Sequence, residues 1–204
     1  MKKYVLGVLL VIMLLIIYLF ILSEDKPLAI ELEKGLYIVD TFDTQSSRKI
    51  TLLEAYKIGM DLAEKYDNDS KLVFMGSVND GEMSGADGKK GDWQGYIKLP
   101  DKKLGIIFVI EKGKLKSYEV INSDEQLAIN AEDIKVDSSQ AVKKAISEFK
   151  LKPGNDNFLD GYHYRLIRDE ENVFLGIGGQ INGKRAEIFI NSKTGNYLGG
   201  IEEN

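Results

Sequence analysis

The chain has 204 residues, of which 44% are hydrophobic and 29% charged, and its formal net charge is −5 at pH 7. It contains no cysteine and a single histidine, which excludes disulfide bonds and the usual cysteine and histidine zinc sites. The acidic balance, with basic residues scattered along the chain, argues against a nucleic-acid partner.

An uncharged apolar run, YVLGVLLVIMLLIIYLFIL, extends from Tyr4 to Leu22. As a helix it would be about 28 Å long, close to the ~30 Å hydrocarbon core of a bilayer. Lys2 and Lys3 precede it, whereas Glu24 and Asp25 follow it. By the positive-inside rule, we expect residues 1–22 to form a single-pass anchor in a cell membrane, with a cytoplasmic N-terminus and an extracytoplasmic remainder.

The alternative is a cleaved signal peptide and a secreted protein. The only candidate cleavage site, Ile21-Leu22-Ser23, lacks the small-x-small pattern, and no cysteine is present to carry a lipid. The net charge of −5 includes Lys2 and Lys3, so the part after Leu22 carries −7.

Residues 23–49 contain LAIELEKGLYIVDTFD, followed by the polar stretch TQSSRK. We expect a juxtamembrane stalk or an added edge strand here, followed by a linker.

Residues 50–133 are predicted to form one helix and an antiparallel meander. The helix ITLLEAYKIGMDLAEKY begins at Ile50, and Thr51 and Glu54 have the spacing of a capping box. Strand patterns follow in KLVFMGSV, WQGYIKL, LGIIFVI and KLKSYEVI, separated by turn residues.

Residues 134–204 are predicted to have the same order. The helix VDSSQAVKKAISEFKL contains Asp137 and Gln140 at capping-box spacing, and the strand patterns YHYRLIR, VFLGIGGQI, KRAEIFI and YLGGI follow. Gly183 in an Asn-Gly hairpin turn, and Gly195 in the next turn, are predicted to supply positive φ angles. The two helices align from Ile50 and Val136, which indicates an internal repeat.

The second unit resembles the PepSY domain family. The resemblance rests on DSSQAVKKAISEF (Asp137 to Phe149), GKRAEIFI and NSKTGNYLG (Asn191 to Gly199), and covers about residues 134–202. Residues 50–122 are similar to a divergent second copy, in which EKGKLKSYEV lacks the Thr-Gly pair of the family's ending.

The predicted elements indicate an α+β fold. We expect an N-terminal transmembrane helix followed by two PepSY-like units, each with one helix packed on a small antiparallel sheet. The resemblance implies a non-catalytic module, of the kind found in propeptides of secreted metalloproteases and in membrane-anchored envelope proteins of Gram-positive bacteria. Such modules are proposed to inhibit or chaperone peptidases.

No motif assigns a catalytic, cofactor-binding or metal-binding residue. His163 lies in a predicted strand without a recognisable catalytic partner. The stretch from Gly76 to Gly95 offers carboxylates to calcium but lacks the EF-hand order, so we interpret it as a flexible hairpin loop. If this loop acts, Trp93 and Tyr96 are the candidate partner-binding side chains.

The leading hypothesis is a non-catalytic, membrane-anchored extracytoplasmic protein that binds or regulates another envelope protein, with a peptidase as one candidate. The alternative is a sensor module that binds a small ligand or an ion in a cleft between the units.

Overall fold

The computed structural model describes residues 32–39, 48–80, 83–123, 126–156 and 159–203, and residues 32–204 form one compact unit. The expected anchor at residues 1–22 lies outside the described residues. Within the described residues, no helix is both long and apolar enough to cross a membrane.

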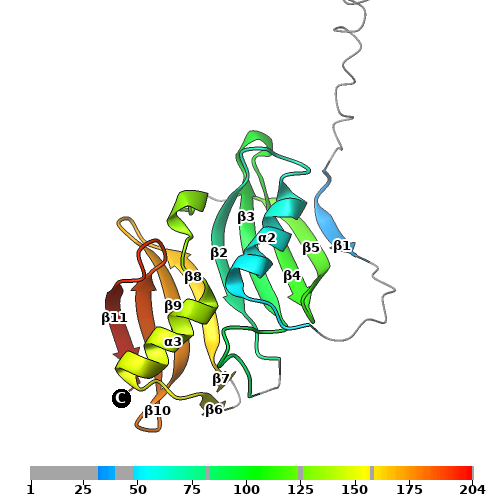
Figure 1. Ribbon diagram of the computed structural model, residues 1–204. Helices are drawn as coiled ribbons and strands as arrows, with labels where there is room; N and C mark the ends of the chain where they lie inside the picture. The colour runs from blue at the N-terminus through cyan, green and yellow to red at the C-terminus, as the bar shows by residue number, and fades with distance from the viewer. Residues whose placement is uncertain (1–31, 40–47, 81–82, 124–125, 157–158, 204) are drawn as a thin grey trace, which may run out of the picture. The chain divides into compact units, whose positions relative to one another are not determined.

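Apart from one short hairpin, the strands of the described residues form one antiparallel sheet (Figure 1). Its nine strands lie in the order β1-β5-β4-β3-β2-β8-β9-β10-β11. Their bounds are β1 Gly35–Ile38, β2 Lys71–Ser77, β3 Trp93–Leu99, β4 Leu104–Glu111, β5 Lys114–Asn122, β8 His163–Arg168, β9 Val173–Ile181, β10 Lys184–Asn191 and β11 Tyr197–Glu202. The short strands β6 (Gly154–Asp156) and β7 (Leu159–Gly161) form a separate hairpin.

The expected fold class, with two units that each have their own small sheet, is wrong. The chain instead builds one continuous and mostly antiparallel sheet, because β2 pairs with β8 at Met75–Leu166 and Gly76–Arg165. β2 and β8 are the first strands of the two predicted meanders, so each has an edge that needs a partner. Pairing these two edges removes two exposed strand edges. The hydrophobic pattern within either meander does not specify which strand pairs with which, so the sequence did not predict this pairing.

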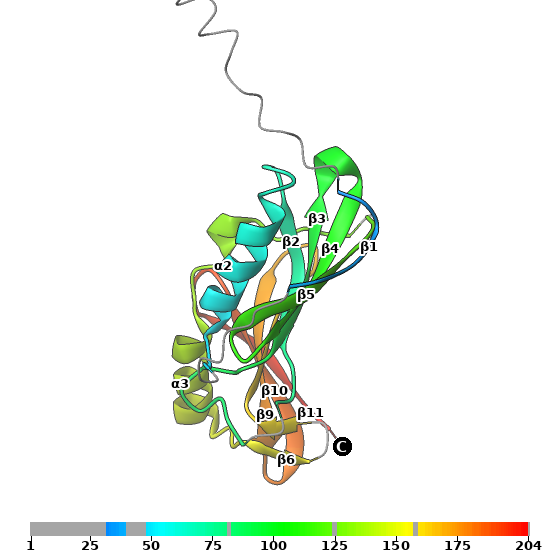
Figure 2. The same ribbon diagram turned by 90° about the vertical axis from the view of Figure 1, so that its right-hand side faces the viewer.

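Two α-helices, α2 (Leu52–Ala63) and α3 (Ser138–Phe149), cover the same face of the sheet (Figure 2). α2 packs on β2 to β5, and α3 packs on β9 and β10. Strand residues that point to this face, such as Phe108 and Ile177, are fully buried. The opposite face of the sheet carries no helix among the described residues.

Both predicted capping boxes are confirmed, one between Thr51 and Glu54 and the other between Asp137 and Gln140. The second cap also serves the first helix. The Leu52 N–H donates to Ser138 Oγ at 2.9 Å, and the next backbone N–H of α2 donates to Asp137 Oδ1 at 3.1 Å. The N-termini of the two helices therefore meet and share side-chain acceptors for amides that would otherwise lack partners.

Gly59 and Gly95 make room for a ring in the core beneath α2. A Cβ at Gly59 would lie 2.7 Å from the ring of Phe108, and one at Gly95 would lie 2.6 Å from the same ring. The helix can thus approach the sheet closely only because both positions lack side chains.

The turns of the second half have the backbone angles that their residues favour. Asn182 and Gly183 have φ angles of 53° and 80°, and Gly195 has a φ of 75°. β1 pairs with β5 as an edge strand, which is one of the two alternatives expected for residues 23–49. The domain boundaries at 49/50 and 133/134 stay predictions.

Candidate functional site

The helix-free face of the sheet, on the right in Figure 2, carries three rows of residues that cross the strands. They arise because every second residue of a strand points to that face. The register from β3 to β10 fixes the members of each row. The aromatic row contains Tyr96, Phe74, Ile167 and Phe174. The glycine row contains Gln94, Gly76, Arg165, Gly176 and Phe189. The polar row contains His163, Gly178 and Glu187.

A groove begins over Gln94, Gly76 and Arg165 of the glycine row, and it continues over Gly178 and Glu187 of the polar row. It consists of a cavity of about 430 Å³ and a second cavity of about 250 Å³. The two share Gly178 and Glu187, and the second continues to Ile201 on β11. At Gly76, a Cβ would lie no closer than 3.4 Å to any neighbour, so a larger residue there would project into the groove.

An ion pair lies within the groove. Arg165 Nε and Nη2 each donate to one carboxylate oxygen of Glu187 at 2.5 Å, and the Arg165 guanidinium lies 5.5 Å from the centre of the Phe189 ring. A Cβ at Gly176 would collide with Glu187 Oε1, so this glycine leaves the space that the pair occupies. The Arg165 side chain is 45% exposed and that of Glu187 19% exposed, which leaves both accessible from the groove.

His163 and Ser77 line the end of the groove near β2. His163 Nε2 lies 3.2 Å from the backbone carbonyl oxygen of Asp160, which only accepts, so Nε2 carries the proton. Nδ1 then accepts a hydrogen bond from the Ser77 hydroxyl at 3.2 Å. Burial, and after it the charge of Lys90, lower the pKa of His163 below its ordinary value of 6.5. The imidazole is therefore neutral at pH 7.

This arrangement is poorly suited to nucleophilic catalysis, although a serine hydroxyl donates to an imidazole. A serine nucleophile needs its histidine to become an imidazolium, which a neighbouring carboxylate usually stabilises. At His163 a neutral carbonyl occupies that place, and both burial and Lys90 oppose a positive charge on the ring. The geometry supports hydrogen bonding to a ligand better than proton transfer.

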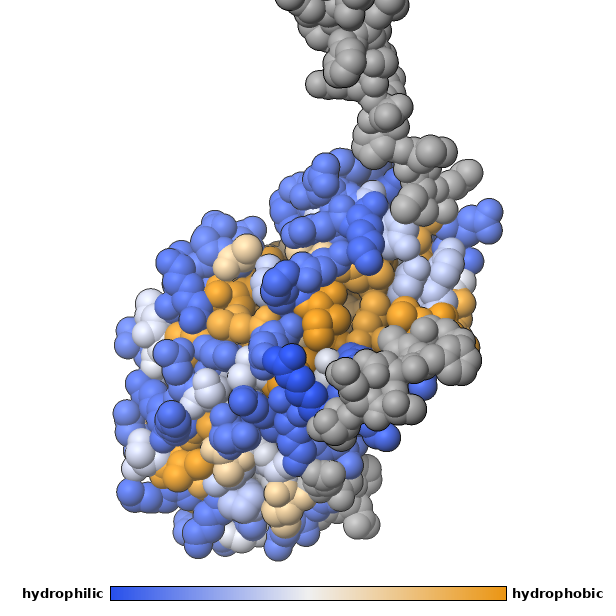
Figure 3. All heavy atoms as spheres, turned by 45° about the vertical axis from the view of Figure 1, so that its right-hand side comes forward, coloured by the Kyte–Doolittle hydropathy of each residue, from blue (hydrophilic) through white to orange (hydrophobic). Residues whose placement is uncertain are grey.

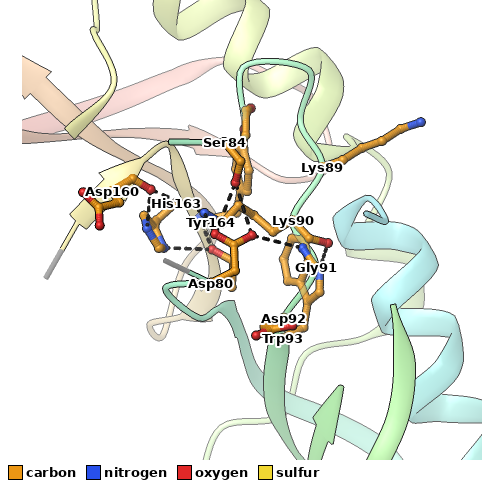
Figure 4. A network of polar contacts seen from close by, with 12 residues as sticks. Asp80, Ser84, Lys89, Lys90, Gly91, Asp92, Trp93, Asp160, His163 and Tyr164 are labelled. Atoms are coloured by element: carbon orange, nitrogen blue, oxygen red, sulfur yellow. Dashed lines mark hydrogen bonds and ion pairs between the residues drawn. The ribbon is translucent and has the colours of Figure 1, made fainter. Parts of the chain in front are cut away.

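A buried charge network lies behind His163 (Figure 4). Lys90 is fully buried, and its Nζ donates to Asp80 Oδ1 at 2.9 Å and to the Asp160 carbonyl at 3.4 Å. The Ser84 hydroxyl donates to Asp80 at 3.2 Å, and the Gly91 N–H donates to it at 3.4 Å. A buried charge needs such partners, because isolated it would be strongly destabilising.

Residues 83–92, called here the connector, join this network to the second half of the chain. The Ser138 hydroxyl donates to the Gly88 carbonyl at 2.6 Å, the Tyr162 N–H donates to the Ser84 carbonyl at 2.8 Å, and the Tyr164 hydroxyl donates to the Gly85 carbonyl. The interpretation of this stretch as a flexible hairpin loop is therefore wrong for residues 83–92. Its glycines serve close backbone approach, since a Cβ at Gly88 would collide with the start of α3.

The structure places both candidate partner-binding rings inside the protein. Trp93 is fully buried, donates from its indole N–H to the Lys90 carbonyl at 3.0 Å and stacks on Tyr164. Tyr96 is 4% exposed, and its ring fills the space beside Gly105, where a Cβ would lie 2.3 Å from it. Neither ring offers an exposed surface to a partner. The two predicted turn glycines, Gly183 and Gly195, lie away from the groove, in turns of the second half.

Three carboxylates considered as calcium ligands have internal partners. Asp80 pairs with Lys90, Asp87 accepts from the Lys89 N–H at 3.0 Å, and Asp92 accepts from the Lys112 N–H at 2.9 Å. Among the described residues, no group of three or more His, Asp or Glu side chains is placed to hold a metal ion.

Sequence reasoning missed the groove residues Phe74, Arg165 and Glu187. Each occupies an ordinary outward position of a predicted strand. Arg165 and Glu187 meet within the second half, and Phe74 joins them only when β2 pairs with β8. Gly76 and Gly176 could have indicated this site, because a glycine inside a strand often marks a place where a ligand or another part of the protein approaches the strand closely.

A second apolar surface lies beside α2 and β1, where apolar side chains reach the surface (Figure 3). Leu36 and Ile38 of β1 are 67% and 72% exposed, and they point to the helix-free face, because they alternate with Tyr37, which stacks on Tyr118.

Comparisons with known proteins indicate the fold but no family. No protein-family model matches the chain, and no curated protein matches it. Among solved structures, the crystal structure of a "putative lipoprotein" from Clostridium difficile 630 is similar, with a TM-score of 0.51 and 14% sequence identity. The match covers 79% of this chain and 97% of that chain. At this identity the likeness concerns the fold alone.

Proposed function

We propose that this chain is a non-catalytic protein of the bacterial cell envelope. In this proposal, it binds a segment of another extracytoplasmic protein in the groove on the helix-free face and thereby regulates that partner. A peptidase is the partner class that the PepSY resemblance implies.

The groove is the observation that carries the proposal. It is open to solvent, it combines an apolar wall with an accessible ion pair, and its residues come from six strands. Binding sites commonly combine apolar lining with a few placed polar groups in this way. The predicted anchor at residues 1–22 and the fold likeness to the Clostridium difficile protein support a place in the envelope.

The environment of His163 supports a non-catalytic role. Its pKa is lowered by burial and by Lys90, and its Nε2 faces a carbonyl rather than a carboxylate. Because nothing stabilises an imidazolium at this site, it is better suited to binding a ligand than to transferring a proton.

Site-specific photocrosslinking in the host bacterium tests the proposal. A photoreactive amino acid at Gln94, which lines the groove, is compared with one at Lys57, whose side chain is 70% exposed on α2. We expect a discrete protein adduct from position 94 that is absent from position 57. The adduct should disappear in Gly76→Leu, which fills the groove, and persist in Gly76→Ala.

Mass spectrometry of the adduct then identifies the partner and its class. Identical adducts from both positions, or an adduct that survives Gly76→Leu, would contradict binding in the groove. A partner that is not a peptidase would remove the peptidase assignment alone.

A small-ligand sensor is the second candidate, because a cavity of about 430 Å³ is within the range of small-molecule sites. A ligand bound only to the folded protein raises the melting temperature by mass action. Thermal melting against a panel of envelope metabolites would favour this candidate if one compound raises the melting temperature of the wild type but not of Gly76→Leu.

A further inference from the structure

We infer that the groove takes an extended peptide segment in which apolar and basic residues alternate. This inference rests on the proposed function and specifies the chemistry of the bound segment. It follows from the dimensions of the groove, the difference between its two walls and the charge of the chain.

The groove has the length of a short extended peptide. From β3, which contributes Gln94, to β11 it crosses five strand spacings of about 4.8 Å, or about 24 Å in all. An extended chain rises about 3.3 Å per residue, so about seven residues fill this length. The occupant lies across the strands and is not an added strand at the sheet edge.

The floor of the groove lets a backbone approach closely. Gly76 of the glycine row and Gly178 of the polar row line the groove without side chains, whereas Arg165 and Glu187 fill the space over Gly176. The Arg165 side chain lies over Phe189 and points to Glu187, toward the polar row. The Gln94 side chain has both donor and acceptor groups for a peptide backbone.

The two walls differ in chemistry. On one side the aromatic row presents Phe74, which is 38% exposed, and Ile167. On the other side the polar row presents His163 and Glu187. Successive side chains of an extended peptide point in opposite directions. A peptide that lies flat along the floor therefore directs alternate side chains to the apolar wall and to the polar wall.

The charge of the chain sets the sign of the polar side chains. The groove is lined by two cations, Arg165 and Arg185, and by the carboxylates of Glu187, Glu202 and Glu203, which gives a formal charge of 2 − 3 = −1. The part of the chain after Leu22 carries −7. Such a surface attracts basic segments and repels acidic ones at long range.

Binding of synthetic peptides to the full-length chain in nanodiscs of zwitterionic lipid tests the inference. Four fluorescent ten-residue peptides serve as probes. One alternates Leu and Lys, one has the same composition with all Leu before all Lys, one alternates Leu and Glu, and one alternates Ser and Lys. Anisotropy is measured at low and at high salt, and binding to empty nanodiscs is subtracted.

We expect the alternating Leu/Lys peptide to bind at least about tenfold more tightly than each of the others, and its affinity to fall with salt. Gly76→Leu should weaken binding at least about tenfold, whereas Gly76→Ala should not. If Gly76→Leu lowers the melting temperature, Phe74→Ser, which alters an exposed side chain of the apolar wall, replaces it.

The inference would be overturned if the peptide with grouped residues, or the Leu/Glu peptide, bound as tightly as the alternating Leu/Lys peptide. Unchanged binding of the alternating peptide to both Gly76→Leu and Phe74→Ser would also overturn it. Failure of the inference is distinguishable from failure of the proposed function. One result would separate the two: a photoreactive residue at position 94 gives a protein adduct that Gly76→Leu abolishes, but the alternating Leu/Lys peptide binds no more tightly than the other peptides. The groove would then bind a protein segment with a different residue pattern.

Discussion

Removing the charge of Lys90 should strongly destabilise the protein. Lys90→Met keeps most of the side-chain volume but leaves Asp80 without its cation. The Lys90 side chain is fully buried and that of Asp80 is 9% exposed, so water cannot replace the lost partner. Breaking a buried ion pair on one side usually lowers the free energy of unfolding by about 3–5 kcal/mol. Because Ser84 and Gly91 still donate to Asp80, we expect about 3 kcal/mol, at the lower end of that range.

Urea unfolding followed by circular dichroism measures this loss. The double variant Lys90→Met/Asp80→Asn removes both charges, so we expect it to recover at least about 1.5 kcal/mol relative to the sum of the single variants. Lys57→Met is the matched control, because Lys57 and Asp61 pair at 2.7 Å with side chains 70% and 56% exposed. It should change the free energy of unfolding by less than about 0.5 kcal/mol. A loss below about 1 kcal/mol in Lys90→Met, or no coupling in the double variant, would refute the reasoning.

Three further predictions concern stability. Gly95→Ala should lower the free energy of unfolding by about 1–3 kcal/mol, because its Cβ would lie 2.6 Å from the Phe108 ring, and unchanged urea unfolding would contradict this packing. Gly195→Val should lower the melting temperature, because Gly195 has a φ of 75° that a β-branched residue tolerates poorly, whereas Lys193→Val in the same turn should have a smaller effect. The folded-state pKa of His163 is below its ordinary value of 6.5. Between these two values, the unfolded chain binds a proton at His163 that the folded protein does not. The free energy of unfolding therefore falls as the pH decreases from above 6.5 toward the folded-state pKa. His163→Gln should reduce the difference in unfolding free energy between pH 7.5 and pH 5, and an unchanged difference would exclude His163 as its source.

Local sequence signals predicted the elements of this fold well. The spacing of Thr51 and Glu54 identified a helix start because a capping box needs only residues three apart. Asn182-Gly183 identified a hairpin because two consecutive positive φ angles strongly favour those residue types. Such signals depend on neighbouring residues and are therefore readable from one sequence.

Long-range pairing was not predictable in the same way. Nothing in KLVFMGSV or YHYRLIR specifies that these two strands pair with each other, and the error in the fold class follows from that gap. The connector was misinterpreted for the same reason. Its glycines are typical of a flexible loop in sequence, but Gly88 is needed because the backbone of α3 lies against it. The anchor and the PepSY resemblance stay predictions.

The groove depends on the union of the two halves. Phe74 and Gln94 come from strands before α3, whereas Arg165 and Glu187 come from strands after it. If β2 and β8 were separate edges, the aromatic row would be interrupted between Phe74 and Ile167. The glycine row would be interrupted between Gly76 and Arg165. Neither half alone would then present two walls of different chemistry around one floor. The candidate binding site thus arises from the edge-to-edge pairing of β2 and β8, and the connector and the shared helix caps at Ser138 hold that pairing in place.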